Sequence, residues 1–71
     1  MWCITKQNFH GEKEVINENL SGPEAMAALQ LIEDKYRKEN PDESFKRGVR
    51  LFRMVKINGS SVVTFEINRM P

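Results

Sequence analysis

The dipeptide Asn58-Gly59 constrains the fold of this 71-residue chain more than any other pair of residues. It separates two runs rich in β-branched and aromatic residues, 49–57 and 60–67. Asn-Gly is typical of a type I′ turn, which needs positive φ at both central residues and matches the twist of paired strands. The last third of the chain, Ser44 to Arg69, is therefore predicted to form one long β-hairpin.

A two-residue turn also fixes which residues of the two strands lie opposite each other. The predicted pairs on one side are Ile57 with Ser60, Val55 with Val62, Arg53 with Thr64 and Leu51 with Glu66. The alternate pairs are Lys56 with Ser61, Met54 with Val63, Phe52 with Phe65 and Arg50 with Ile67. Because successive side chains point to opposite faces of a strand, we expect one apolar face to form the core. That face carries Phe52, Met54, Val63, Phe65 and Ile67.

The other face of the predicted hairpin is mixed in character, with Glu66 placed diagonally to meet Arg53. Its members are Val49, Leu51, Arg53, Val55, Val62, Thr64 and Glu66. This face is more apolar than a fully solvated sheet surface needs to be. It is either an ordinary scatter of exposed apolar residues or a surface for a protein partner, including a second copy of the chain.

A second, shorter hairpin is predicted at the N-terminus, with strands over 1–8 and 12–19 joined near Phe9-His10-Gly11. A three-residue loop with Gly11 in the left-handed region is a common hairpin solution. The expected pairs are Ile4 with Ile16, Thr5 with Val15 and Lys6 with Glu14. This register places Trp2, Ile4 and Ile16 on one apolar face, with Leu20 following in phase.

Ser21-Gly22-Pro23-Glu24 is the clearest helix start in the chain. Ser21 can cap the helix, Pro23 lies where its missing N–H costs nothing, and Glu24 completes a capping box. The predicted helix runs from Gly22 to Glu39, since Asn40 precedes a proline and is biased away from helical angles. Its apolar stripe is Ala25, Ala28, Leu29, Ile32 and Tyr36, widened by Met26 and Leu31. The opposite face carries the i, i+4 pairs Glu33–Arg37 and Asp34–Lys38.

The predicted fold class is α+β: a single small domain over residues 1–71 with the element order β-β-α-β-β. If the helix returns along the sheet, a fully antiparallel arrangement favours the strand order 2-1-3-4, with the helix on one face. The expected core comprises the helix stripe with Trp2, Ile4, Ile16, Phe52, Met54, Val63, Phe65 and Ile67.

Cysteine and histidine content limits the possible chemistry, because the chain has one of each. Cys3 alone excludes an internal disulfide, and the pair excludes the usual zinc ligand sets. His10 lies in a predicted turn without a partner for catalysis, and nothing near Cys3 lowers the pKa of its thiol. The glycines suit turns, caps or bulges, and no phosphate-binding loop is present. We therefore expect no enzyme, no cofactor, no metal site and no small-molecule substrate.

Length and hydropathy give weaker indications of location and assembly. No apolar run reaches the roughly 20 residues of a transmembrane helix, and no secretory signal is visible. The expectation is a cytoplasmic protein without a membrane partner. A chain this small has a limited core and often gains stability by forming oligomers.

Charge divides the chain into two unequal parts. Residues 1–44 hold five cations against nine acids, a net charge of −4, and residues 45–71 hold six cations against one acid, a net charge of +5. Five of these cations, Lys46, Arg47, Arg50, Arg53 and Lys56, lie within the first strand of the long hairpin and its approach. A basic ribbon can contact nucleic-acid phosphates, although alternation sends these side chains to both faces.

Two functions therefore remain open. The first is a non-enzymatic protein-interaction module, either a homodimer or an inhibitor-like adaptor, that uses the open sheet face or an edge of the C-terminal hairpin. Its expected contact residues are Val49, Leu51, Arg53, Val55, Val62 and Thr64. The alternative is a nucleic-acid-binding protein that contacts phosphates through Lys46, Arg47, Arg50, Arg53 and Lys56.

Overall fold

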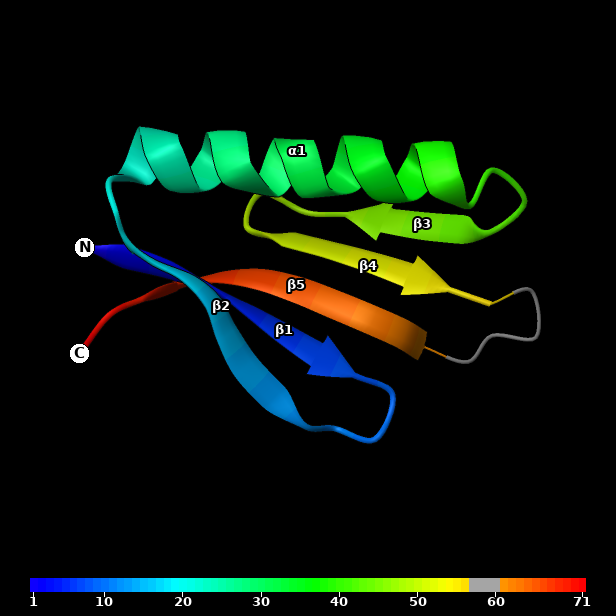
Figure 1. Cartoon of the computed structure of the whole chain (residues 1–71), viewed down its shortest axis with the longest axis horizontal. Helices are drawn as coiled ribbons and strands as arrows, with labels where there is room; N and C mark the ends of the chain where they lie inside the picture. The colour runs from blue at the N-terminus through cyan, green and yellow to red at the C-terminus, as the bar shows by residue number, and fades with distance from the viewer. Residues whose placement is uncertain (57–60) are drawn as a thin grey trace.

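A computed structural model, which describes residues 1–56 and 61–71, has one helix packed on one face of an antiparallel sheet of five strands (Figure 1). The elements are β1 (Trp2–Asn8), β2 (Lys13–Leu20), α1 (Gly22–Glu39), β3 (Ser44–Arg47), β4 (Leu51–Val55) and β5 (Ser61–Arg69). The order of the strands across the sheet is β2-β1-β5-β4-β3. The α+β class is confirmed, but the predicted count of four strands is wrong.

The predicted strand order 2-1-3-4 is also wrong, and the short strand β3 gives the physical reason. The N–H of Gly48 donates to the carbonyl of Leu51 at 2.8 Å, so the chain reverses between β3 and β4. After this reversal β4 runs in the same direction as β1, whereas β5 runs antiparallel to β1 and pairs with it. The predicted hairpin over 44–69 is therefore a three-stranded meander.

The pairing of β4 with β5 follows the predicted register over most of its length. Leu51 with Glu66, Phe52 with Phe65, Arg53 with Thr64 and Met54 with Val63 are confirmed as partners. The register shifts after Met54, so Val55 pairs with Ser61. The predicted pairs Val55 with Val62 and Lys56 with Ser61 are therefore wrong. The Asn58-Gly59 turn and the pair Ile57–Ser60 lie outside the described residues.

The N-terminal hairpin confirms two of the three predicted pairs, Thr5 with Val15 and Lys6 with Glu14. The pairing of β1 with β2 shifts register on each side of Asn17. Ile4 therefore lies opposite Asn17 and not opposite Ile16. Such bulges insert extra residues into one strand and turn their side chains out of phase. Ile16 is 42 % exposed as a result, so its predicted place in the core is wrong.

Helix α1 begins and ends at the predicted residues because its local signals are complete. The hydroxyl of Ser21 accepts from the N–H of Glu24 at 3.2 Å, and the Glu24 carboxylate accepts from the N–H of Ser21 at 2.9 Å. At the other end, the N–H of Asn40 donates to the carbonyl of Tyr36 at 2.9 Å. The helix and the capping box are therefore confirmed.

The core lies between α1 and the sheet and contains the predicted face of the C-terminal strands. Its buried members are Ile4, Ala25, Leu29, Phe52, Met54, Val63, Phe65 and Ile67, with Trp2, Leu20, Ala28, Ile32, Tyr36, Phe45 and Val62 packed around them. Met26 and Leu31 do not belong to it, because they are 41 % and 69 % exposed. Helix residues on the flank and the outer side cannot reach the sheet, so their predicted burial is wrong.

Candidate functional site

The residues considered for catalysis or metal binding lie in ordinary structural positions. His10 is exposed in the turn after β1, where its N–H donates to the Asn8 side-chain oxygen at 2.9 Å. Cys3 is buried, at 7 % exposure. Within residues 1–56 and 61–71, no three His, Cys, Asp or Glu side chains lie close enough to hold a metal ion. No α-helix in that part of the chain is long and apolar enough to cross a membrane.

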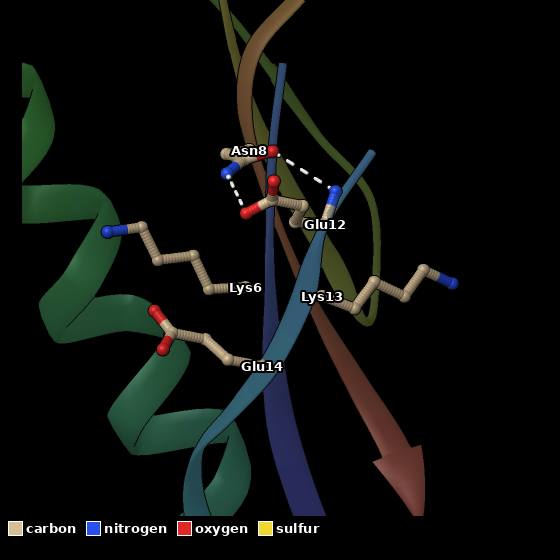
Figure 2. A pocket seen from close by; sticks show the side chains of 5 residues that line it. All are labelled: Lys6, Asn8, Glu12, Lys13 and Glu14. Carbon is tan, nitrogen blue, oxygen red and sulfur yellow. Dashed lines mark hydrogen bonds between the residues drawn. The ribbon is translucent and has the colours of Figure 1, made fainter. Parts of the chain in front are cut away.

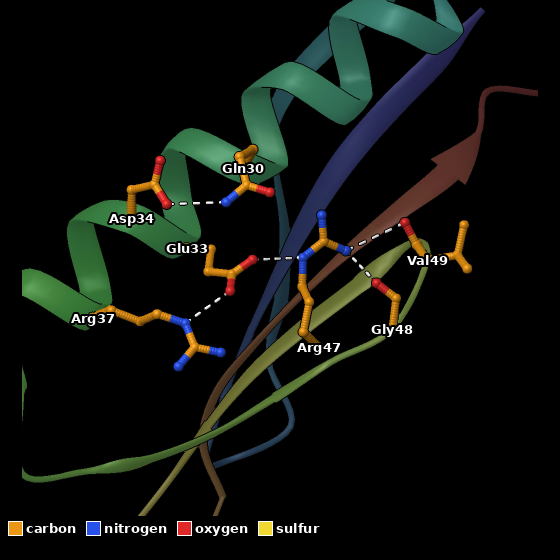
Figure 3. A network of polar contacts seen from close by, with 7 residues as sticks. All are labelled: Gln30, Glu33, Asp34, Arg37, Arg47, Gly48 and Val49. Atoms are coloured by element: carbon orange, nitrogen blue, oxygen red, sulfur yellow. Dashed lines mark hydrogen bonds and ion pairs between the residues drawn. The ribbon is translucent and has the colours of Figure 1, made fainter.

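A polar network joins α1 to β3 through Glu33, as Figure 3 shows. One oxygen of the Glu33 carboxylate accepts from Nε of Arg37 at 2.7 Å, and the other accepts from Nε of Arg47 at 2.7 Å. The Glu33–Arg37 pair was predicted, but not the burial of Glu33, which is 8 % exposed and lies on the sheet side of the helix. Asp34 accepts from Gln30 at 3.0 Å.

Two opposing effects act on the Glu33 carboxyl group. Burial raises the pKa of Glu33, because the charged form loses hydration. Hydrogen bonds from Arg37 and Arg47, with the positive charges of both, lower this pKa, and the net shift is downward from the ordinary value of 4.5. Glu33 is therefore ionised at neutral pH and holds both guanidinium groups in place.

Arg47 also fixes the turn between β3 and β4. Its Nη1 donates to the carbonyl of Gly48 and, at 3.3 Å, to the carbonyl of Val49 (Figure 3). These contacts hold the turn on the helix side of the sheet, with Val49 at 76 % exposure. The predicted place of Val49 on the open sheet face is therefore wrong, because the unpredicted chain reversal at Gly48 carries it to the other side.

Val49 and Met26 line two adjoining hollows, which together we call the Met26–Val49 groove. The first, a wide and shallow depression, is lined by Met26, Gln30, Glu33, Arg47, Gly48 and Val49. The second, about 200 Å³, is lined by Trp2, Gly22, Met26, Val49, Arg50 and Ile67. The groove follows one flank of α1 and combines exposed apolar side chains with arginine.

The Trp2 ring at one end of this groove is covered by two cations. The guanidinium carbon of Arg50 lies 4.6 Å from the ring centroid, and that of Arg69 lies 5.5 Å from it. Cation–π contacts of this kind attract both groups to the ring. They concentrate positive charge beside the apolar floor of the groove.

The remaining predicted protein-binding residues lie on the sheet or in its core. Leu51, Arg53, Val55 and Thr64 are each half-buried, and Val62 packs against the core cluster. Nε of Arg53 donates to the Thr64 hydroxyl at 3.1 Å. We expected Arg53 to meet Glu66, but no ion pair between them is present. The predicted interaction face is thus divided between two sides of the molecule.

The five cations predicted to contact nucleic acid do not form one patch. Arg47 binds Glu33, Arg50 covers Trp2, and Nζ of Lys56 lies 3.5 Å from the Glu43 carboxylate. Lys46 and Arg53 are direct neighbours on β3 and β4, on the face away from α1. The structure therefore separates these two cations from the other three.

Another hollow, of about 360 Å³, lies at the end of the N-terminal hairpin (Figure 2). It is lined by Lys6, Asn8, Glu12, Lys13 and Glu14. Lys6 and Glu14 project toward α1, whereas Lys13 projects the opposite way (Figure 2). Its cations and acids balance, and none of its side chains is fully buried, so it defines no specific ligand.

Comparison of the chain with protein-family models, curated proteins and solved structures returns no match. The chemistry of these surfaces is therefore the basis for a functional assignment. The sequence-based prediction missed Trp2 and Met26 as residues of the Met26–Val49 groove, because it assigned both to the core. No local pattern marks them, because the groove forms only where the turn after β3 lies beside α1.

Proposed function

We propose that this protein is a small, non-enzymatic protein-interaction module that binds a partner in the Met26–Val49 groove. The observation that carries the proposal is Val49, an aliphatic residue 76 % exposed on a turn that Arg47 holds in place. An exposed apolar surface with a polar rim is typical of a protein-binding site. A turn already held in one conformation loses little further entropy when a partner binds.

The charge of the groove indicates what the partner carries. Its one carboxylate, Glu33, already pairs with two arginines, and Arg50 and Arg69 lie beside Trp2. Positive charge next to an apolar floor complements a segment with a carboxylate close to a large apolar side chain. The proposed partner is therefore an acidic–apolar segment of another protein.

A second copy of this chain is a less favourable occupant of the groove. In a two-fold symmetric dimer the same patch meets itself, which would bring the arginines of both grooves together. We therefore propose a partner other than the protein itself. Light scattering at high concentration is expected to give a monomer.

The direct test selects binders for the intact protein from a random peptide library and then measures their affinities. Selected peptides are expected to contain an acidic residue beside a large apolar one. Val49→Asp places a negative charge on the groove without disturbing the core, and it should weaken binding by about tenfold or more. Leu31→Asp is the matched control, because Leu31 is 69 % exposed on α1 but lines neither hollow.

Two results would contradict the proposal. One is a selection that enriches no acidic–apolar sequence. The other is equal binding of the selected peptides to the wild-type protein and to Val49→Asp. If the protein forms a dimer in solution and Val49→Asp dissociates it, the occupant of the groove is a second copy of the chain and not a separate partner.

A further inference from the structure

A continuous row of paired residues crosses all five strands on the sheet face opposite α1. Lys13 pairs with Gln7, Gln7 with Thr64, Thr64 with Arg53, and Arg53 with Lys46. We call these five residues the open-face row. We infer that the open-face row binds the phosphate backbone of a single-stranded nucleic acid, a function separate from that of the Met26–Val49 groove.

The alternation of side chains places the three cations of the row on one face. Arg53 lies between Phe52 and Met54, which are buried against α1, so its own side chain points away from the helix. Lys46 lies between Phe45, which packs on the core, and Arg47, which binds Glu33 on α1. Lys13 projects away from the helix side, as Figure 2 shows. Four strand spacings give the row a length of about 19 Å.

The row itself contains three cations and no acid, although Glu66 lies on the same face, two residues along β5 from Thr64. Lys46 and Arg53 are directly opposite each other on neighbouring strands, an arrangement of like charges that costs stability. The ion pairs among residues 1–56 and 61–71 include none of Lys13, Lys46 and Arg53. Nε of Arg53 donates to the Thr64 hydroxyl at 3.1 Å, which fixes the guanidinium along the row. A bound anion would relieve the repulsion between these cations.

Protection of a sheet edge does not account for this arrangement. Charged residues on edge strands prevent strands of different molecules from pairing, and Lys46 on β3 could serve that purpose. Arg53 cannot, because β4 lies between β3 and β5 and both of its edges are paired. Edge protection therefore does not explain Arg53, whereas binding of an anion on this face does.

An exposed aromatic side chain lies next to the row. Phe9 is 69 % exposed and lines a hollow of about 220 Å³ together with the row members Gln7, Arg53 and Thr64. The rings of Phe9 and His10 lie with their centroids 3.9 Å apart. Gly11, at φ +86°, permits the tight turn that holds them. This turn was not among the residues predicted to contact nucleic acid.

Cations beside an exposed aromatic ring are the combination that binds single strands without sequence preference. The cations contact phosphates, and an unpaired base stacks on the ring. In a duplex the base faces are covered by their neighbours, so Phe9 would contribute little. This difference favours a single strand over a duplex as the ligand.

Fluorescence anisotropy with labelled oligothymidine of about 12 nucleotides tests the inference. The full chain is expected to bind it with a micromolar Kd that weakens as salt rises. Three phosphate contacts on a single strand predict a slope of about −2 for log affinity against log salt. An unlabelled duplex and polyglutamate of similar charge are expected to compete weakly.

Matched pairs of lysines provide the control. Lys13→Gln/Lys46→Gln removes two charges from the row and should weaken binding by about fivefold or more and reduce the salt slope. Lys35→Gln/Lys38→Gln removes the same charge from exposed positions on α1 and should leave the Kd within about twofold. Phe9→Leu keeps an apolar side chain but removes the stacking surface, so it should also weaken binding. Circular dichroism verifies that each variant is folded.

Several results would overturn the inference. Absence of saturable binding at low salt, or an affinity independent of salt, would exclude phosphate contacts. Equal affinities of the two double variants would exclude the open-face row as the site. Stronger competition by polyglutamate than by unlabelled oligothymidine would identify an acidic polypeptide as the ligand. Failure of this experiment leaves the groove proposal intact, because no residue of the row lines the groove.

Discussion

The Glu33 carboxylate on α1 accepts a hydrogen bond from Nε of Arg47 on β3 at 2.7 Å, and this pair connects the helix to an edge strand of the sheet. The Glu33 carboxylate also binds Arg37, and the Arg47 guanidinium also binds the turn that contains Val49. One buried acid therefore links the position of β3 to the shape of the groove.

Glu33→Gln is expected to destabilise the protein. The amide keeps the size of the side chain but loses the charge that compensates two arginines, and such charged hydrogen bonds contribute about 1–3 kcal/mol. Urea denaturation at neutral pH measures the change. Asp34→Asn is the control, since Asp34 is exposed and accepts from Gln30 on the same helix, and it should stay within about 0.5 kcal/mol. Equal effects of the two variants would contradict a stabilising role for the network.

Stability should also depend on pH through Glu33. Because the pKa of the folded carboxyl lies below its ordinary value of 4.5, the unfolded chain takes up this proton at a higher pH than the folded one. The stabilisation is complete well above 4.5, decreases as pH falls through that value, and is lost below the folded pKa. Urea denaturation from about pH 7 to pH 3 should show the difference between wild type and Glu33→Gln shrinking. A difference that stays constant over this range would contradict the lowered pKa.

Phe52 lies at the centre of the aromatic core and has no exposed surface. Its ring lies parallel to that of Phe45, with centroids 5.6 Å apart, and Tyr36 approaches it edge-on at 6.2 Å. Phe52→Ala is expected to cost about 3–5 kcal/mol, a large share of the stability of so small a domain. Thermal denaturation by circular dichroism should show a partly or fully unfolded variant. Leu31→Ala, at an exposed position, should leave the midpoint almost unchanged.

Features that depend on neighbours in the sequence were predictable. The capping box of Ser21 and Glu24 specifies where α1 begins without any tertiary contact. The pairing of Phe52 with Phe65 was predicted from a two-residue turn, and it agrees with the alternation that places both rings on the core face. These elements are confirmed since their local and tertiary preferences agree.

Features that depend on distant contacts were not predictable. The reversal at Gly48 lies inside a run that reads as one continuous strand, so β3 and the resulting strand order were missed. The bulges of β2, one of which displaces Ile16, leave no clear mark in the sequence. For Glu33 only its partner on the same helix was predicted, because Arg47 reaches it through the tertiary fold. Both candidate surfaces depend on such juxtapositions.

Arg47→Lys separates the ion pair from the shape of the turn. Lysine keeps the positive charge near Glu33, but its single ammonium group cannot also span the carbonyls of Gly48 and Val49 as the planar guanidinium does. We expect a modest loss of stability, about 1 kcal/mol, together with a larger loss of affinity for peptides selected on the groove. Amide hydrogen exchange should become faster at Gly48, whose N–H donates to the Leu51 carbonyl across the turn, while that of the central strands changes little. If exchange becomes faster but peptide affinity stays at the wild-type level, the turn need not be rigid for binding. That result would contradict the proposal that the groove is pre-organised.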